Sequence, residues 1–327
     1  MKAITWAIAG ATGMVGKMFL QILAERKTPV DKLYLFASSQ SAGKTMEFNG
    51  QTITIEELSP EVFKRGIDIA LFAIESDLSR KYAPIAAENG CVVVDNSSAW
   101  RMDASVPLVV PEVNAKEAKN NKGIIANPNC CAIPAVIALN PLHKAYGVKR
   151  IVYSTYQSVS GAGIGGWNDL TDTLNGKEPA HFPYKIAGNI IPHIDSFHDD
   201  GYTGEEIKLI EETKKILNAP EIKATATTVR VPVYTGHCLS INVTFDKPFI
   251  LDDVKRLLQD APGIRLYDDP ANKIYPTPLV AAGTDLVYVG RIRRDESFEN
   301  SLNLWVAADN VRKGAATNAV QTAEYLL

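Results

Sequence analysis

The sequence lacks the features that mark membrane and nucleic-acid-binding proteins. None of its apolar runs reaches the roughly 18 residues that a membrane-spanning helix needs. The net charge of the 327-residue chain is only −3, and no long run of one sign appears. Basic patches for nucleic acid or anionic membranes usually show as such runs. We therefore expect neither a nucleic-acid partner nor a membrane partner.

Cysteine is also scarce. The four cysteines stand at positions 91, 130, 131 and 238. They have neither C-x-x-C spacing nor a histidine pair suited to zinc, so the sequence predicts no metal site. Four cysteines are too few for a disulfide framework in a chain of this length, and reduced thiols indicate a cytoplasmic protein. The apolar fraction of 46% is ordinary for a chain that buries a core and has room for two domains.

The N-terminus combines an apolar run with regularly spaced glycines. Residues 1–11 could pass for a signal peptide, but the apolar run at residues 3–9 leads directly into Gly10, Gly13 and Gly16 and an amphipathic stretch at residues 14–25. A strand, a glycine turn and a helix in this order favour a dinucleotide site, because the glycines let a pyrophosphate approach the helix N-terminus. Glycine turns are common, so this signal is weak when taken alone.

The end of the second predicted strand, at residues 33–37, bears on the choice of cofactor. NAD sites usually place an acidic residue there to bind the ribose 2′-hydroxyl. This chain offers Ser38, Ser39 and Gln40, followed by Lys44. Hydroxyl, amide and ammonium groups suit a 2′-phosphate, which favours NADP. The alternative is a polar loop without a ligand.

Strands and helices alternate through the first third of the chain. Apolar runs at residues 67–73 and 92–95 flank a helical stretch at residues 78–89, a pattern typical of a doubly wound parallel sheet. Such folds bind ligands at the carboxyl ends of their strands. Arg101, which follows the strand at residues 92–95, is therefore a candidate anion-binding residue, or else an ordinary surface arginine.

The second part of the chain has a different pattern. Longer strands are predicted at residues 150–157, 237–245, 286–294 and 302–308, which suggests a mixed or antiparallel sheet in a separate domain. The segment at residues 176–204 is rich in glycine, proline and polar residues and is predicted to be a long irregular connection. The overall prediction is an α/β protein with a doubly wound dinucleotide-binding domain and an α+β domain.

Cys130 stands between a predicted strand at residues 124–126 and a predicted helix at residues 132–146. A thiol at a helix N-terminus meets the positive end of the helix dipole and unpaired backbone N–H groups, which favour the thiolate. Cys130 is therefore a candidate nucleophile. The alternative is that Cys130 and Cys131 simply fill the core.

Several motifs together resemble one family, aspartate-semialdehyde dehydrogenase. They span the whole chain in the order of that family: the glycine turn at residues 10–16, Asn129-Cys130, Tyr156-Gln157, the turn at residues 160–163, the stretch at residues 205–208, Arg230 with His237, and residues 309–316. The resemblance implies NADPH-dependent reduction of L-aspartyl 4-phosphate to L-aspartate 4-semialdehyde and phosphate, a step toward lysine, methionine, threonine and isoleucine. It also implies a homodimer.

The resemblance further implies a role for individual residues. Cys130 would be the nucleophile, His237 the acid/base group and Gln157 a positioning residue. The implied substrate-binding residues are Arg230 for the carboxylate, Glu205 for the amine, Arg101 and Lys208 for phosphate, and Asn129. The implied cofactor-binding residues are Gly10, Thr12, Gly13, Met14, Val15, Ser38, Ser39, Gln40, Ser160, Gly161, Gly163 and Asn310. Where many members have an arginine, this chain has Gln40.

The same resemblance divides the chain into domains. Residues 1–129 and 309–327 would form the NADP-binding Rossmann-like domain, and residues 130–308 the catalytic and dimerisation domain. Two alternatives stay open: a related acyl-phosphate reductase of the N-acetyl-glutamyl-phosphate type, whose substrate has no free amine for Glu205 to bind, or a non-catalytic NADP-binding paralogue.

Overall fold

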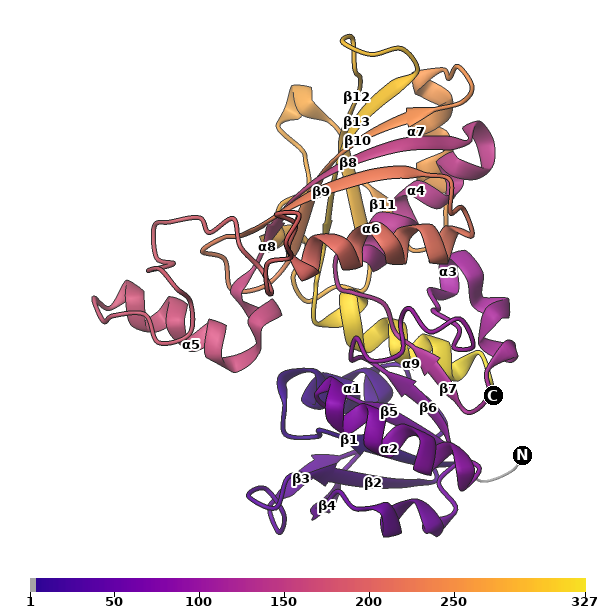
Figure 1. Ribbon diagram of the computed structural model, residues 1–327, viewed down its shortest axis with the longest axis vertical. Coiled ribbons are helices and arrows are strands. Elements are labelled where there is room, and N and C mark those ends of the chain that lie inside the picture. Colours follow the sequence, from indigo (N-terminus) through magenta and orange to yellow (C-terminus); the bar gives the residue numbers. More distant parts are fainter. Residues whose placement is uncertain (1–3) are drawn as a thin grey trace. The chain divides into compact units, whose positions relative to one another are not determined.

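The computed structural model describes residues 4–327 and divides the chain into two compact units. Unit 1 contains the residues up to Pro128 together with Ala315–Leu327, and unit 2 is Asn129–Gly314. The chain returns to unit 1 at Ala315, so residues 309–314 lie in unit 2. Each unit has its own sheet (Figure 1).

Unit 1 is built on a seven-stranded sheet in the order β3-β4-β2-β1-β5-β6-β7. All neighbouring strands are parallel except β3 and β4, which pair antiparallel. The strands are β1 (Thr5–Ala9), β2 (Lys32–Ala37), β3 (Thr45–Phe48), β4 (Gln51–Glu57), β5 (Ile69–Phe72), β6 (Val92–Asp95) and β7 (Ile124–Ala126). Ala3, where the first strand was predicted to begin, lies outside the described residues.

Both faces of the unit 1 sheet are covered, as a parallel sheet requires. Trp6 and Ile8 of β1 are fully buried in one apolar cluster, and the alternating Ala7 and Ala9 are buried on the opposite face. The helices of this unit are α1 (Met14–Glu25), α2 (Ser76–Glu88), the short α3 (Pro111–Asn114) and α9 (Thr317–Glu324). Helix α9 packs on α1 and on strands β5 and β6, so the C-terminal segment completes this core.

Unit 2 is built on a six-stranded sheet in the order β11-β12-β13-β10-β8-β9. Strand β8 pairs parallel with β9 and β11 pairs parallel with β12, whereas the three central pairings are antiparallel. The strands are β8 (Val148–Gln157), β9 (Lys223–Arg230), β10 (His237–Phe245), β11 (Ile264–Leu266), β12 (Val287–Arg294) and β13 (Ser301–Ala308). The predicted fold class, a parallel doubly wound sheet followed by a mixed sheet, is therefore confirmed.

Several helices of unit 2 pack against its sheet. Helices α4 (Ala132–Tyr146), α6 (Gly204–Leu217) and α7 (Leu251–Asp260) pack on the sheet, with α4 in contact with four of its strands (Figure 1). Helix α4 is apolar almost all round, which is typical of a buried helix. The short α8 (Pro278–Ala281) contacts β13.

Among residues 4–327, no helix is long and apolar enough to cross a membrane.

Several elements of unit 2 were not predicted, namely β9, β11, α5, α7 and α8. Strand β9 was not predicted, although its alternation of small residues and threonines fits a half-buried strand. Helix α5 (Gly163–Leu174) starts within the glycine-rich turn, where only a loop was expected. Residues 176–203, by contrast, contain no helix or named strand, as predicted.

Candidate functional site

Cys130 is held at the start of α4 by its neighbour Asn129. The side-chain Oδ1 of Asn129 accepts a hydrogen bond from the backbone N–H of Cys131 at 2.8 Å, which fixes the turn that leads into the helix. The backbone N–H of Asn129 donates to Glu212 at 2.6 Å, and its side-chain Nδ2 donates to Glu205 at 2.9 Å. Cys130 is partly exposed, whereas Cys131 is buried. The loop thus fixes the backbone of a partly exposed cysteine.

The pKa values of the two adjacent thiols are shifted in opposite directions. A hydrogen bond from Cys131 holds the pKa of Cys130 well below its usual range, and the nearby His237 and Arg230 act in the same direction. Burial, together with the charge on Cys130, raises the pKa of Cys131 well above its usual range. Cys130 is therefore the thiolate of the pair and Cys131 the thiol.

His237, the first residue of β10, is completely buried. Its Nδ1 accepts a hydrogen bond from the backbone N–H of Ser158 at 3.1 Å, and the Ser158 hydroxyl lies 3.0 Å from the same nitrogen. A nitrogen that accepts from a backbone N–H carries no proton, so we assign the neutral ring's proton to Nε2. That Nε2 is buried and has no aligned hydrogen-bond partner. A ring nitrogen of His237 and the sulfurs of Cys130 and Cys131 lie within 4.8 Å of one another.

A carboxylate and two amides meet beside the thiols. Glu205 of α6 accepts hydrogen bonds from Gln157 at 3.1 Å and from Asn129 at 2.9 Å. Thr155 donates to the amide oxygen of Gln157 at 2.9 Å, which fixes the orientation of that amide. Lys208 lies 3.8 Å from Glu205 but forms its closer ion pair with Asp195, at 2.5 Å.

Arg230 brings a buried positive charge to this group. It ends β9 directly opposite Gln157 of β8, and its Nη1 donates to the carbonyl of Ser158 at 2.8 Å. Only 5% of the residue is exposed, burial lowers its pKa, and its Nε has no hydrogen-bond partner. An unpaired buried donor is costly, so it is well placed to receive an anionic ligand atom.

The turn after β8 passes so close to Arg230 and His237 that position 161 must be glycine. A Cβ on Gly161 would lie 2.8 Å from the Arg230 guanidinium and 3.1 Å from the His237 ring. Next to it, Asn310 accepts from Ser158 at 3.0 Å and donates to Ser160 at 2.9 Å. Gly163 has a positive φ of 68° at the start of α5.

Unit 1 has a pocket of about 430 Å³ at the carboxyl ends of β1 and β2. Of the predicted cofactor residues, it is lined by Gly10, Thr12, Gly13, Ser38 and Ser39. Glycine is required at position 10, because φ is +84° and a Cβ would lie 2.1 Å from the carbonyl oxygen of Ala73. The glycine turn of this pocket therefore has no room for a side chain at position 10.

Four other predicted residues of unit 1 do not line this pocket. Met14 and Val15 form the first turn of α1, and Gln40 is exposed in the next turn of the chain. Arg101 is buried, and it donates to the carbonyl oxygens of Asn127 at 3.0 Å and Asn96 at 2.7 Å.

Sequence reasoning missed two residues. Glu57, at the end of β4, lines the pocket together with Ser38 and Ser39. Glu57 was missed because an acidic residue at the cofactor ribose was expected only at the end of the second predicted strand. Ser158 was missed because nothing in the sequence pairs it with His237, which is 79 residues away.

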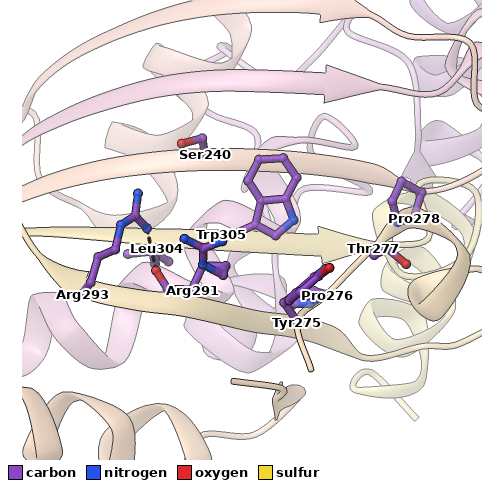
Figure 2. Close-up of a pocket in the computed structure, with 9 residues that line it drawn as sticks. All are labelled: Ser240, Tyr275, Pro276, Thr277, Pro278, Arg291, Arg293, Leu304 and Trp305. Carbon is purple, nitrogen blue, oxygen red and sulfur yellow. Dashed lines mark hydrogen bonds between the residues drawn. The ribbon is translucent and has the colours of Figure 1, made fainter. Parts of the chain in front are cut away.

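Unit 2 has a pocket of about 390 Å³ on its sheet. This pocket is not lined by Cys130, His237 or the side chains around them. Figure 2 shows Trp305 beside the strands, with Arg291, Arg293 and Tyr275 around it. Tyr156 of β8 lies against Trp305, with ring centroids 5.2 Å apart, and is 38% exposed. This sheet face therefore presents aromatic and cationic side chains to solvent.

Comparison with known proteins covers nearly the whole chain. Residues 5–121 match the family model described as "Semialdehyde dehydrogenase, NAD binding domain", and residues 139–313 match "Semialdehyde dehydrogenase, dimerisation domain". The aspartate-semialdehyde dehydrogenase of Aquifex aeolicus is 51% identical over 98% of this chain and 97% of its own. The chain belongs to the aspartate-semialdehyde dehydrogenase family. The aspartate-semialdehyde dehydrogenase of Bacillus subtilis is 47% identical over 98% of this chain and 96% of its own.

Solved structures of aspartate-semialdehyde dehydrogenases agree in fold. Aspartate semialdehyde dehydrogenase II of Vibrio cholerae, complexed with ASA, has a TM-score of 0.96 at 47% identity, covering 100% of this chain and 98% of its own. The Candida albicans enzyme with NADP has a TM-score of 0.79 at 27% identity, covering 99% and 98%. The predicted family and oxidoreductase activity are confirmed, and an NAD(P)-binding domain is present.

Proposed function

We propose that this aspartate-semialdehyde dehydrogenase reduces L-aspartyl 4-phosphate with NADPH, through a thioester on Cys130, to L-aspartate 4-semialdehyde and phosphate. The observation that carries this proposal is the partly exposed, acidic Cys130 thiol beside the buried ring of His237. A thiolate adds readily to an acyl carbon, which splits one difficult displacement into two easier steps.

Cys130 and His237 divide the chemistry between them. The thiolate of Cys130 attacks the acyl carbon, and the carbon–oxygen bond to phosphate breaks to leave a thioester. NADPH, when bound, supplies the hydride that reduces this thioester. His237 donates its Nε2 proton to the oxygen that becomes negative and takes a proton back as the carbon–sulfur bond breaks. The aldehyde leaves and Cys130 is a thiolate again.

Ser158 sets up His237 for the proton transfer. Its backbone N–H donates a hydrogen bond to Nδ1, so the transferable proton of the neutral ring is on Nε2. Because the ring is fully buried, bulk water does not compete for that proton.

The amino-acid end of the substrate meets groups of opposite charge. The free Nε of Arg230 supports binding of the substrate carboxylate, and the carboxylate of Glu205 supports binding of its ammonium group. Gln157 and Asn129 both donate to Glu205, so this carboxylate is held in one orientation. An N-acetylated substrate has no ammonium group for Glu205, which favours aspartyl phosphate over its acetyl-glutamyl counterpart.

We assign the phosphate group to Arg101 and Lys208. Arginine binds oxyanions through a planar fork and lysine through a point charge. Lys208 is paired with Asp195 at 2.5 Å, so binding phosphate through Lys208 exchanges one anion for another. This exchange gives Asp195 a part in phosphate affinity.

The cofactor residues of unit 1 fit a nucleotide. The glycine turn has no room for a Cβ at Gly10 or at Gly16, where it would lie 2.1 Å from a backbone oxygen, and the turn opens the N-terminus of α1. Thr12, Met14 and Val15 belong to the same turn. Ser38, Ser39 and Gln40 favour a 2′-phosphate and hence NADP, whereas Glu57 on the same pocket opposes a second negative charge. In unit 2 we assign Ser160, Gly161, Gly163 and Asn310 to the cofactor.

We also propose that residues 1–129 with 309–327 act as the NADP-binding domain and residues 130–308 as the catalytic and dimerisation domain of a homodimer. The solvent-facing side of the unit 2 sheet carries Trp305 (Figure 2), and Tyr156 lies against that ring. This side supports pairing with a second copy because exposed aromatic patches mark interfaces. All four cysteines are free thiols, which supports a cytoplasmic protein.

The test is phosphate-dependent reduction of NADP by the purified protein supplied with L-aspartate 4-semialdehyde. NAD and N-acetyl-glutamate semialdehyde run in parallel as alternative cofactor and substrate. Turnover that requires phosphate and prefers the amino-acid aldehyde supports the proposal. Equal turnover of the acetylated aldehyde, or none with either cofactor, contradicts it.

A further inference from the structure

The fold creates a cluster of metal ligands that the sequence spacing did not predict. The sulfurs of Cys130 and Cys131 and one ring nitrogen of His237 lie within 4.8 Å of one another. The two cysteines are adjacent at the start of α4, and the histidine comes from β10, more than 100 positions later. Three such atoms at this separation can share one small ion after modest side-chain rotation.

The ring nitrogen of His237 that is available to an ion is the one without a hydrogen-bond partner. Nδ1 of His237 is occupied by the backbone N–H of Ser158, and Nε2 is buried with no aligned hydrogen-bond partner. In many metal-binding histidines the nitrogen that does not coordinate donates its N–H to a second group. When Nε2 of His237 coordinates an ion, its proton moves to Nδ1, from which the Ser158 hydroxyl, 3.0 Å away, can accept a hydrogen bond. His237 is thus oriented for coordination as well as for proton transfer.

The donor set selects the type of ion. When an ion binds, Cys131 releases its proton to solvent and becomes a second thiolate beside that of Cys130. Two thiolates and an imidazole are soft or borderline ligands, which favour Zn²⁺ and other thiophilic ions over Mg²⁺ or Ca²⁺. Glu205 is already engaged by two amide donors, so it does not turn the cluster into an oxygen-rich site. Cys130 is partly exposed, which gives an ion a path from solvent.

We propose that Cys130, Cys131 and His237 form an inhibitory site for a thiophilic divalent cation, for which Zn²⁺ is the probe. Binding places the ion on the sulfur that attacks the substrate and on the nitrogen that carries its proton. Cys131 provides the third ligand, so it makes this site tighter than one cysteine and one histidine would. Inhibition rests on the proposed role of Cys130, whereas ion binding does not.

Metal binding is tested first by spectroscopy, which does not depend on catalysis. Reduced, desalted protein is titrated with Co²⁺, whose thiolate complexes absorb in the near ultraviolet. One equivalent should bind, and Cys131→Ala should lose about half of the thiolate absorption because one of two sulfur ligands is gone. Cys91→Ala, which removes a buried thiol of unit 1, is the matched control and should match the unmodified protein.

The affinity for Zn²⁺ is then measured by competition with a chromogenic chelator. Cys131→Ala and His237→Gln should each weaken binding on the order of 100-fold, since loss of a direct ligand exceeds the cost of losing an outer-shell partner. His237→Gln should keep the two-thiolate Co²⁺ absorption. Thermal unfolding of every variant establishes that it is folded.

Inhibition is measured on the active enzyme as loss of turnover against added Zn²⁺, with recovery on adding a chelator. Zn²⁺ should inhibit the unmodified enzyme and Cys91→Ala alike, and Cys131→Ala only at about 100-fold higher concentration. The proposal is overturned if Cys131→Ala matches the unmodified protein in Co²⁺ absorption or Zn²⁺ affinity. If the protein binds Zn²⁺ as expected but has no turnover to inhibit, the proposed function fails and the metal site stands.

Discussion

The pocket of unit 1 and the side-chain cluster of unit 2 are built in different ways. The pocket depends on backbone geometry at its glycine turn, where Gly10 has a positive φ and leaves no room for a Cβ. The cluster is a side-chain structure, in which α4, β8, α6, β9 and β10 each contribute one or more groups.

This difference has consequences for substitutions. A backbone site tolerates changes in most side chains but fails where a glycine is lost. A side-chain site depends on each functional group and on the neighbours that orient it. Unit 1 should therefore be sensitive to steric bulk, and unit 2 should be sensitive to chemistry.

The largest effect should come from changing one atom in the unit 2 cluster. Cys130→Ser leaves the shape nearly unchanged but replaces a stabilised thiolate with a weakly acidic hydroxyl. Turnover should fall by at least about 10⁴-fold. Steady-state rates with NADP, aldehyde and phosphate measure it, with Cys91→Ala as the thiol control. A residual rate within tenfold of the unmodified enzyme would move the nucleophile away from Cys130.

The next effect tests the backbone of the pocket. Gly10→Ala adds a Cβ 2.1 Å from the carbonyl oxygen of Ala73, so the turn must shift. We expect a lower unfolding temperature and a cofactor KM raised on the order of 100-fold. Gly43→Ala is the matched control, because its φ is +85° but no atom lies within 4 Å of the added Cβ. If both variants behave alike, backbone strain rather than steric clash is the cause.

A smaller effect separates the two adjacent thiols. Cys131→Ala removes the hydrogen bond that contributes most to the low pKa of Cys130, so that pKa should rise. The acid limb of the pH profile of kcat/KM should then move to higher pH, and turnover should fall mainly on the acid side. Cys131→Ser keeps a donor and should restore much of the profile. An unshifted limb in Cys131→Ala would mean that His237 and Arg230 alone stabilise the thiolate.

The smallest effect concerns the rim of the pocket. Glu57→Gln removes an exposed negative charge beside Ser38 and Ser39, so the preference for NADP over NAD should rise, by at most about fivefold because water screens exposed charges. Parallel kcat/KM measurements with the two cofactors test it, and Glu61→Gln, in the exposed pair with Lys64, is the control. A fall in the NADP preference would show that Glu57 does not face the ribose.

Some elements were predictable because their signals are local. The run of residues 5–9, the glycines after it and the apolar stripe of α1 lie within about 20 positions, and burial on both faces of β1 follows from its composition. Strand β9 was missed because its polar and small residues are buried only through neighbouring strands. Helix α5 was missed because its first turn contains three glycines, which have low helix propensity, yet later residues pack it in place.

Sequence by itself determined the class of the fold, the glycine turn and, through several ordered motifs, the family. Tertiary structure alone decided which groups touch. It paired Lys208 with Asp195, placed Ser158 on Nδ1 of His237, added Glu57 to the pocket and brought Cys131 to the same cluster as His237. The reason is physical: backbone preferences and hydrophobic periodicity act over a few residues, whereas hydrogen bonds and charge interactions depend on distances that only the packed chain sets.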